Sequence, residues 1–181
     1  MEEKKMKRIL IAADDTKGSL GVLDVFRNQV RPPEEVILVH VQRILGRSLM
    51  GDMLSETEMA TLKEAVKDSE FQEELDRKSE KVLAFYKKEL ESHGLFRIKT
   101  VVRAGNVTEE ILRVAEEEKA DLLILGCNGK VGLDRLISGC VTKDVERKTQ
   151  IPVMVAKAGG CKVKDKPCDV PAGLEEVYNA G

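Results

Sequence analysis

Short apolar runs alternate along the chain with longer segments in which apolar residues recur every three or four positions. Four runs, residues 8–13, 36–41, 121–125 and 151–156, are almost continuously apolar. Runs of this length are typical of strands that are buried on both faces of a parallel sheet. A fifth segment, residues 96–103, alternates between apolar and polar positions, which predicts a strand nearer the edge of the sheet.

Helical periodicity predicts helices in the intervening segments. They span residues 18–30, 71–90 and about 139–148, and a further helix begins after Asn106, a residue type that caps helices. The apolar stripe of the helix at 71–90 consists of Phe71, Leu75, Val82, Phe85, Tyr86 and Leu90. Strands that alternate with helices pair in parallel through right-handed crossovers. The chain is therefore predicted to form a doubly wound, five-stranded parallel α/β sheet flanked by helices.

Two segments lie outside this alternation. Residues 42–69 form a long insertion after the second strand, in which Ser55 and Glu58 have the spacing of a capping box. The apolar residues on one face of the helix expected there are Met59, Leu62 and Val66. This helix either completes the core or covers a ligand site, since long insertions at strand ends often serve the second role. Residues 158–181 are expected to be a flexible tail after a single domain at 1–157.

Composition adds few constraints on function. Hydrophobic residues make up 42% of the chain, charged residues 34%, and the formal net charge is -2. That balance gives no reason to expect nucleic acid as an electrostatic partner. No apolar run approaches the roughly 18 residues of a membrane helix, and the run after the charged N-terminus is too short for a secretion signal. We therefore expect a cytoplasmic protein that does not bind a membrane, whose four cysteines, which contain no CxxC pair, are free thiols.

The loops that follow the first and fourth strands carry the candidate chemistry, because ligands of open α/β sheets bind beyond the carboxyl ends of strands. Residues 14–17 begin with two aspartates, and residues 126–129 place two glycines three positions apart. A third glycine, Gly139, follows after nine intervening residues and opens the last helix. Glycines let the backbone approach a ligand, and free amides at a helix start attract phosphate. Glycines at such turns are common, so the pattern by itself also fits a turn without a ligand.

The same residues carry a resemblance to a known family. Residues 126–141 resemble the G-x2-G-x9-G-[ST] signature of ATP-binding universal stress proteins. Residues 8–14 resemble that family's first strand with its aspartate, and residues 151–155 resemble its last strand. Residues 101–107 resemble its V-x-x-G-x-P turn, with Val107 where proline is usual. The resemblance extends from about residue 7 to residue 157.

The resemblance implies an adenine nucleotide alpha hydrolase-like, Rossmann-like fold in which the first and fourth strands are neighbours. It implies that Asp14 contacts adenine, and that Ala12 and the backbone of Val41 line the base. Ribose and phosphates of ATP, with or without Mg, would be surrounded by Gly126, Asn128, Gly129, Gly139, Cys140, Val141 and Thr142. It further implies a homodimer that pairs through the last strand, Ile151 to Ala156, and acts as a nucleotide-dependent switch on an unknown regulatory protein partner in the stress response.

One departure from the signature keeps a second interpretation open. The final Ser or Thr of the pattern is Cys140 here, a weak hydrogen-bond donor. Losing one neutral hydrogen bond costs about 0.5–1.5 kcal/mol, so binding would weaken by roughly tenfold at most. The alternative is a nucleotide-free dimeric interaction module of the same fold. Cys140 at a helix start could also act as a redox-sensitive switch, whereas the tail pair Cys161 and Cys168 is an incomplete metal-ligand set.

Dedicated catalysis is not expected, although slow ATP hydrolysis is a further alternative. The chain lacks the Walker A, GxGxxG, HExxH and GxSxG motifs. Of its two histidines, His40 lies in a predicted buried strand and His93 at a helix end, positions where a structural role is the usual one. The sequence therefore offers no evident general base and no catalytic residue.

Overall fold

The computed structural model describes residues 6–44, 54–95, 97–127 and 141–157. Its five strands form one sheet with the order β3-β2-β1-β4-β5, and every neighbouring pair is parallel. The strands are β1 (Arg8–Ala12), β2 (Glu35–Gln42), β3 (Ile98–Ala104), β4 (Leu122–Cys127) and β5 (Val153–Lys157). The predicted doubly wound α/β sheet is thus confirmed, and the alternating segment, now β3, lies at an edge as expected.

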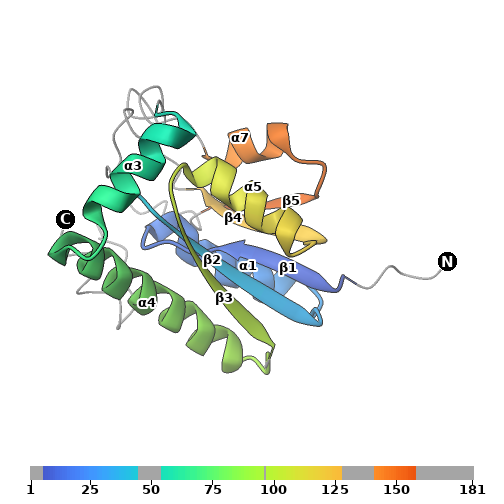
Figure 1. The fold of residues 1–181 in the computed structure, drawn as a ribbon. Coiled ribbons are helices and arrows are strands. Elements are labelled where there is room, and N and C mark those ends of the chain that lie inside the picture. The colour runs from blue at the N-terminus through green and yellow to red at the C-terminus, as the bar shows by residue number, and fades with distance from the viewer. Residues whose placement is uncertain (1–5, 45–53, 96, 128–140, 158–181) are drawn as a thin grey trace, which may run out of the picture.

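Helices cover both faces of the sheet (Figure 1). They are α1 (Lys17–Gln29), α3 (Glu56–Val66), α4 (Glu70–Glu91), α5 (Val107–Glu117) and α7 (Val141–Lys148). On one face, Ile9 and Ile11 of β1 pack with apolar residues of α1 and α4. On the other face, Leu10 packs with residues of α5 and α7. Because successive strand residues alternate between two covered faces, the runs had to be apolar throughout.

Local chemistry explains where several helices begin. The side chain of Asn106 accepts a hydrogen bond from the backbone N–H of Glu109, as its position predicted for the start of α5. Ser55 and Glu58 form the complete capping box that the sequence predicted for α3. Among the described helices none is long and apolar enough to span a membrane.

The apolar stripe predicted for α4 is wrong at Phe71, in the first turn of the helix. Phe71 is 47% exposed, whereas Val82, Tyr86 and Leu90 further along the helix are buried. Polar side chains in the first half of α4 meet the side chain of Gln42, which is only 4% exposed. Its amide nitrogen donates to Asp76 (2.8 Å) and Ser79 (2.9 Å), and its amide oxygen accepts from Gln72 (3.3 Å).

Helix α3 contributes no buried residue. The expectation that this helix completes the core is therefore wrong for the described structure, although its apolar residues are half-buried. In its first turn, Glu56 lies 3.4 Å from Arg113 of α5 in an exposed ion pair. Figure 1 shows α3 beyond the end of the sheet where the strands terminate, beside the starts of α4 and α5.

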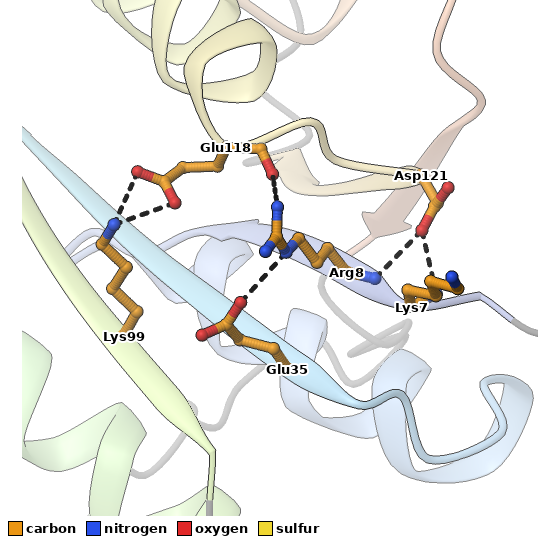
Figure 2. A network of polar contacts seen from close by, with 6 residues as sticks. All are labelled: Lys7, Arg8, Glu35, Lys99, Glu118 and Asp121. Carbon is orange, nitrogen blue, oxygen red and sulfur yellow. Dashed lines mark hydrogen bonds and ion pairs between the residues drawn. The ribbon is translucent and has the colours of Figure 1, made fainter.

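A polar network fixes the opposite end of the sheet, where the strands begin (Figure 2). The Asp121 carboxylate accepts hydrogen bonds from the backbone N–H groups of Lys7 (2.9 Å) and Arg8 (3.0 Å). The Arg8 guanidinium contacts Glu35 and the carbonyl oxygen of Glu118, each at 3.1 Å. These contacts tie the starts of β1, β2 and β4 together.

Candidate functional site

The pairing of β1 with β4 brings the two candidate loops together. The register pairs Ile11 with Ile124, and Asp14 and Cys127 each lie three residues further on. Residues the same number of positions beyond a paired position lie equally far along two parallel strands. The Asp14 loop and the Gly126–Cys127 segment therefore leave the sheet side by side. The strand order changes direction at this point, which is where open α/β sheets bind ligands.

Several of the predicted site residues pack on one side of this point. Ala12, Val41 and Val141 are partly buried against the apolar cluster beneath α5 and α7. Thr142, in the first turn of α7, is 5% exposed. Gly126 and Cys127 are half-buried at the end of β4. Four predicted residues, Asn128, Gly129, Gly139 and Cys140, lie outside the described residues.

The Asp14 carboxylate is held by its own loop. Its Oδ1 accepts hydrogen bonds from the backbone N–H of Thr16 (2.8 Å) and from the Thr16 hydroxyl (2.6 Å). Thr16 is the N-cap residue of α1, but its side chain makes no capping hydrogen bond, because the hydroxyl is turned toward Asp14. The contacts of Asp14 with the rest of the described chain leave its second oxygen, Oδ2, without a donor. Asp14 therefore presents one oriented acceptor at the carboxyl end of β1.

The neighbouring carboxylate has a different partner. Asp15 Oδ2 lies 2.6 Å from the ammonium group of Lys78 on α4. Two adjacent aspartates thus have separate tasks, since one is neutralised by a lysine and the other is held by a hydroxyl and an amide. The sequence showed both aspartates but not which of them is engaged by a cation.

A buried hydroxyl pair lies beneath the same loop. The hydroxyls of Ser19 in α1 and Tyr86 in α4 are 2.6 Å apart. Ser19 Oγ accepts a hydrogen bond from the backbone N–H of Asp14 at 3.1 Å. The apolar periodicity places Tyr86 in a stripe of its helix and gives no signal for Ser19, because no local pattern links residues so far apart along the chain.

The two histidines occupy hydrogen-bonded positions away from any acid or base pair. His40 is buried in β2, and its Nδ1 lies 2.8 Å from the carbonyl oxygen of Ala13. Because a carbonyl only accepts, Nδ1 carries the proton in this contact. The Nδ1 of His93 lies 2.9 Å from the carbonyl oxygen of Glu89 at the end of α4. His40 therefore helps to fix the chain between β1 and the Asp14 loop.

The turn between β3 and α5 depends on Gly105. Its φ of +142° lies in a region that residues with a side chain rarely adopt. Its N–H donates to the carbonyl oxygen of Gln42 at 3.2 Å, which joins the ends of β2 and β3. Just beyond the turn the buried Glu110 lies 2.8 Å from Arg113 and 4.0 Å from Arg103. These ion pairs link the end of β3 to the first turns of α5.

The start of α3 carries a carboxyl group with a shifted pKa. Hydrogen bonds from the side chain and the backbone of Ser55 lower the pKa of the Glu58 carboxyl below its ordinary value. Within the described ranges, no group of three His, Cys, Asp or Glu residues is placed to hold a metal ion.

Comparison with known proteins decides the family. The model of the universal stress protein family matches residues 5–157. The chain belongs to the universal stress protein family. It is 35% identical over 157 residues to universal stress protein MJ0577 of Methanocaldococcus jannaschii, with 83% of this chain and 94% of that protein covered. It is 25% identical over 151 residues to YxiE of Bacillus subtilis, with 83% and 98% covered.

Solved structures of universal stress proteins have the same fold. The structure of MJ0577 superposes with a TM-score of 0.61 at 30% identity, covering 84% of this chain and 96% of that one. An Arabidopsis thaliana member with AMP bound has a TM-score of 0.56 at 15% identity, covering 83% and 91%. A universal stress protein in complex with cAMP has a TM-score of 0.54 at 15% identity, covering 86% and 99%. The fold implied by the sequence resemblance is thereby confirmed.

Proposed function

We propose that this universal stress protein binds an adenine nucleotide, with ATP as the expected ligand, and acts as a nucleotide-dependent regulator. The observation that supports this most is the Asp14 carboxylate, which has one oxygen fixed by Thr16 and the other free of donors from the described chain. The AMP and cAMP bound by related proteins are consistent with it.

The free oxygen suits adenine for a simple chemical reason. A carboxylate oxygen accepts hydrogen bonds, and the 6-amino group of adenine donates them. Guanine carries an oxygen at the same position, which a carboxylate would repel. In this proposal Ala12 and the backbone of Val41 line the base. The ribose and phosphates lie toward Gly126, Val141 and Thr142, together with the predicted residues outside the described ranges.

The dimeric part of the proposal rests on the two sheet edges. The β3 edge presents Lys99 and Arg103, and charged side chains discourage pairing with another strand. The β5 edge presents Val153, Met154 and Val155, which are half-buried and apolar. A second copy that pairs along β5 would satisfy the backbone groups of this edge and cover these side chains. We place the regulator in the cytoplasm and expect it to act on a protein partner, with a domain at 1–157 and a tail at 158–181.

The test is calorimetric titration of the full chain with ATP, with and without Mg, and with AMP and GMP. The sharpest variant is Asp14→Asn, because it keeps Oδ1 for Thr16 but replaces Oδ2 with an amide that donates. A hydrogen bond to a charged group contributes about 1.5–3 kcal/mol, so ATP binding should weaken by roughly 10- to 100-fold. GMP should lose little or gain, since the new amide can donate to the guanine oxygen.

Asp15→Asn is the matched control, because it makes the same change at the adjacent carboxylate that faces Lys78. It should leave the preference for adenine unchanged. If the folded wild-type protein binds none of these nucleotides, the proposal is wrong and the nucleotide-free dimeric module takes its place.

Sedimentation of wild type and of Val155→Lys tests the β5 interface: a dimer that persists in the variant contradicts pairing along this strand.

A further inference from the structure

The hydroxyl pair of Ser19 and Tyr86 is buried between two helices that meet beneath the Asp14 loop. Tyr86 is 0% exposed and Ser19 is 1% exposed. Their oxygens lie 2.6 Å apart, a short distance for two hydroxyls. A buried hydroxyl requires partners, and here each of the two provides one for the other.

The pair also reaches the backbone of Asp14 from below. Ser19 Oγ accepts from the Asp14 N–H at 3.1 Å. When the Ser19 hydroxyl donates its proton to Tyr86, the Tyr86 hydroxyl donates to the Asp14 carbonyl oxygen at 3.4 Å. A longer contact of 3.5 Å joins Ser19 Oγ to the carbonyl oxygen of Ala12. Both main-chain polar groups of Asp14 are therefore bound by side chains that no solvent reaches.

The side chain of Asp14 is fixed independently by Thr16. With backbone and carboxylate both held, the direction of Oδ2 is set before any ligand arrives. A group that is already oriented loses less conformational freedom on binding, which increases affinity without adding a contact.

We propose that Ser19 and Tyr86 are positioning residues that orient Asp14 for adenine. The inference rests on the nucleotide site proposed above and adds two residues that touch no nucleotide. The simpler explanation is that Tyr86 only fills the core and Ser19 only satisfies its hydroxyl. The ring of Tyr86 does fill the core, with its centroid 5.6 Å from that of Phe85, so the ring and the hydroxyl have separable effects.

Tyr86→Phe separates them, because it removes the hydroxyl and keeps the ring. Ser19→Ala removes the acceptor of the Asp14 N–H and should have the larger effect. The matched control is Ser79→Ala, which removes another buried hydroxyl of α4 that contacts Gln42 and the Leu75 carbonyl but not the Asp14 loop.

Two readouts distinguish positioning from packing. The first is hydrogen exchange and the NMR shift of the Asp14 amide without nucleotide. Exchange should accelerate at least about tenfold in Ser19→Ala and less in Tyr86→Phe. The second is the affinity for ATP relative to GMP, which should fall by roughly three- to tenfold in Ser19→Ala, the loss of about one neutral hydrogen bond. Ser79→Ala should lower the melting temperature while leaving both readouts unchanged.

The outcomes separate this proposal from the proposed function. If both variants leave the Asp14 amide and the ATP-to-GMP ratio at wild-type values, the positioning role is refuted even when ATP binds normally. If Ser79→Ala shifts the ratio equally, general loosening of α4 is the cause and the proposal is also wrong. A wild-type protein that binds no nucleotide refutes the adenine site. The Asp14 amide then still decides whether the pair orients the loop, because it is measured without ligand.

Discussion

Replacing Gly105 by alanine tests how much the turn between β3 and α5 depends on its backbone conformation. Gly105 has a φ of +142°, and it joins the end of β3 to the cap of α5. An alanine there must either adopt this unfavourable φ or distort the turn. Its N–H also donates to the carbonyl oxygen of Gln42, so a distorted turn would weaken the link between β2 and β3.

The distances around Gly105 show that the cost comes from backbone strain. An added Cβ would lie 3.5 Å from Glu110 Oε1 and 3.6 Å from Lys63 Nζ, which are ordinary contacts. Strain in such a backbone region costs about 1–3 kcal/mol. Alanine also restricts the unfolded chain more than glycine does, which offsets about 0.4–1 kcal/mol of this strain. We therefore expect Gly105→Ala to lower the free energy of unfolding by about 1–2 kcal/mol, or the melting temperature by roughly 2–8 °C.

The assay is urea and thermal unfolding followed by circular dichroism. Gly94→Ala is the matched control, because Gly94 has a φ of +83° and an added Cβ would meet nothing within 4 Å. The left-handed backbone conformation costs an alanine about 1–2 kcal/mol, and the restricted unfolded chain offsets part of that cost. This variant should therefore lose less stability than Gly105→Ala. Gly105→Ala as stable as wild type would refute the reasoning, since the turn would then not require a positive φ. A loss above about 4 kcal/mol would equally refute it, because it would mean a steric clash that the distances exclude.

Three further predictions concern charged groups. Because Ser55 lowers the pKa of Glu58, the stabilisation of α3 by this carboxylate is present above the unfolded pKa and is lost as pH falls through the lower folded pKa. Ser55→Ala should return that pKa toward its ordinary value in an NMR titration, and an unchanged pKa would contradict this. Glu110→Ala should lower stability by about 1–2 kcal/mol in urea unfolding, less than for a fully buried pair because its arginine partners are partly exposed. Wild-type stability of that variant would show that the pair contributes nothing. Asp121→Ala removes the acceptor of two backbone N–H groups at the start of β1 (Figure 2). It should lower the free energy of unfolding by about 1–2 kcal/mol. Fast amide exchange at Arg8 in the wild-type protein would contradict this.

The elements of the fold could be predicted from the sequence because their causes are local. The run at residues 36–41 is apolar at every position but one, so both of its faces had to be covered, as β2 confirms. Asn106 and Ser55 mark helix starts because a short polar side chain can accept from an amide two or three residues ahead. Such signals involve residues that are only a few positions apart, so the sequence alone contains both partners of each interaction.

The order of the strands is not a local property. Nothing in the apolar pattern states that β1 lies between β2 and β4, and the resemblance to universal stress proteins supplied that expectation. The candidate site follows from it, because Asp14 and Gly126 become neighbours only through this order. Residues 128–140 carry the rest of the signature, so their part in the site remains a prediction.

Tertiary structure alone decided which polar residues are interior. Periodicity treats a polar residue as facing solvent, so it did not place Ser79 of α4 against Gln42, and it gave Phe71 to the core. It also left Ser19 and Tyr86 unconnected. A buried polar group is stable only if a partner lies within hydrogen-bond reach, and that partner is 67 residues away along the chain for this pair. The sequence by itself determined the strands, the helices and their caps. The fold determined which hydroxyls and amides are buried, because only the fold brings their hydrogen-bond partners within reach.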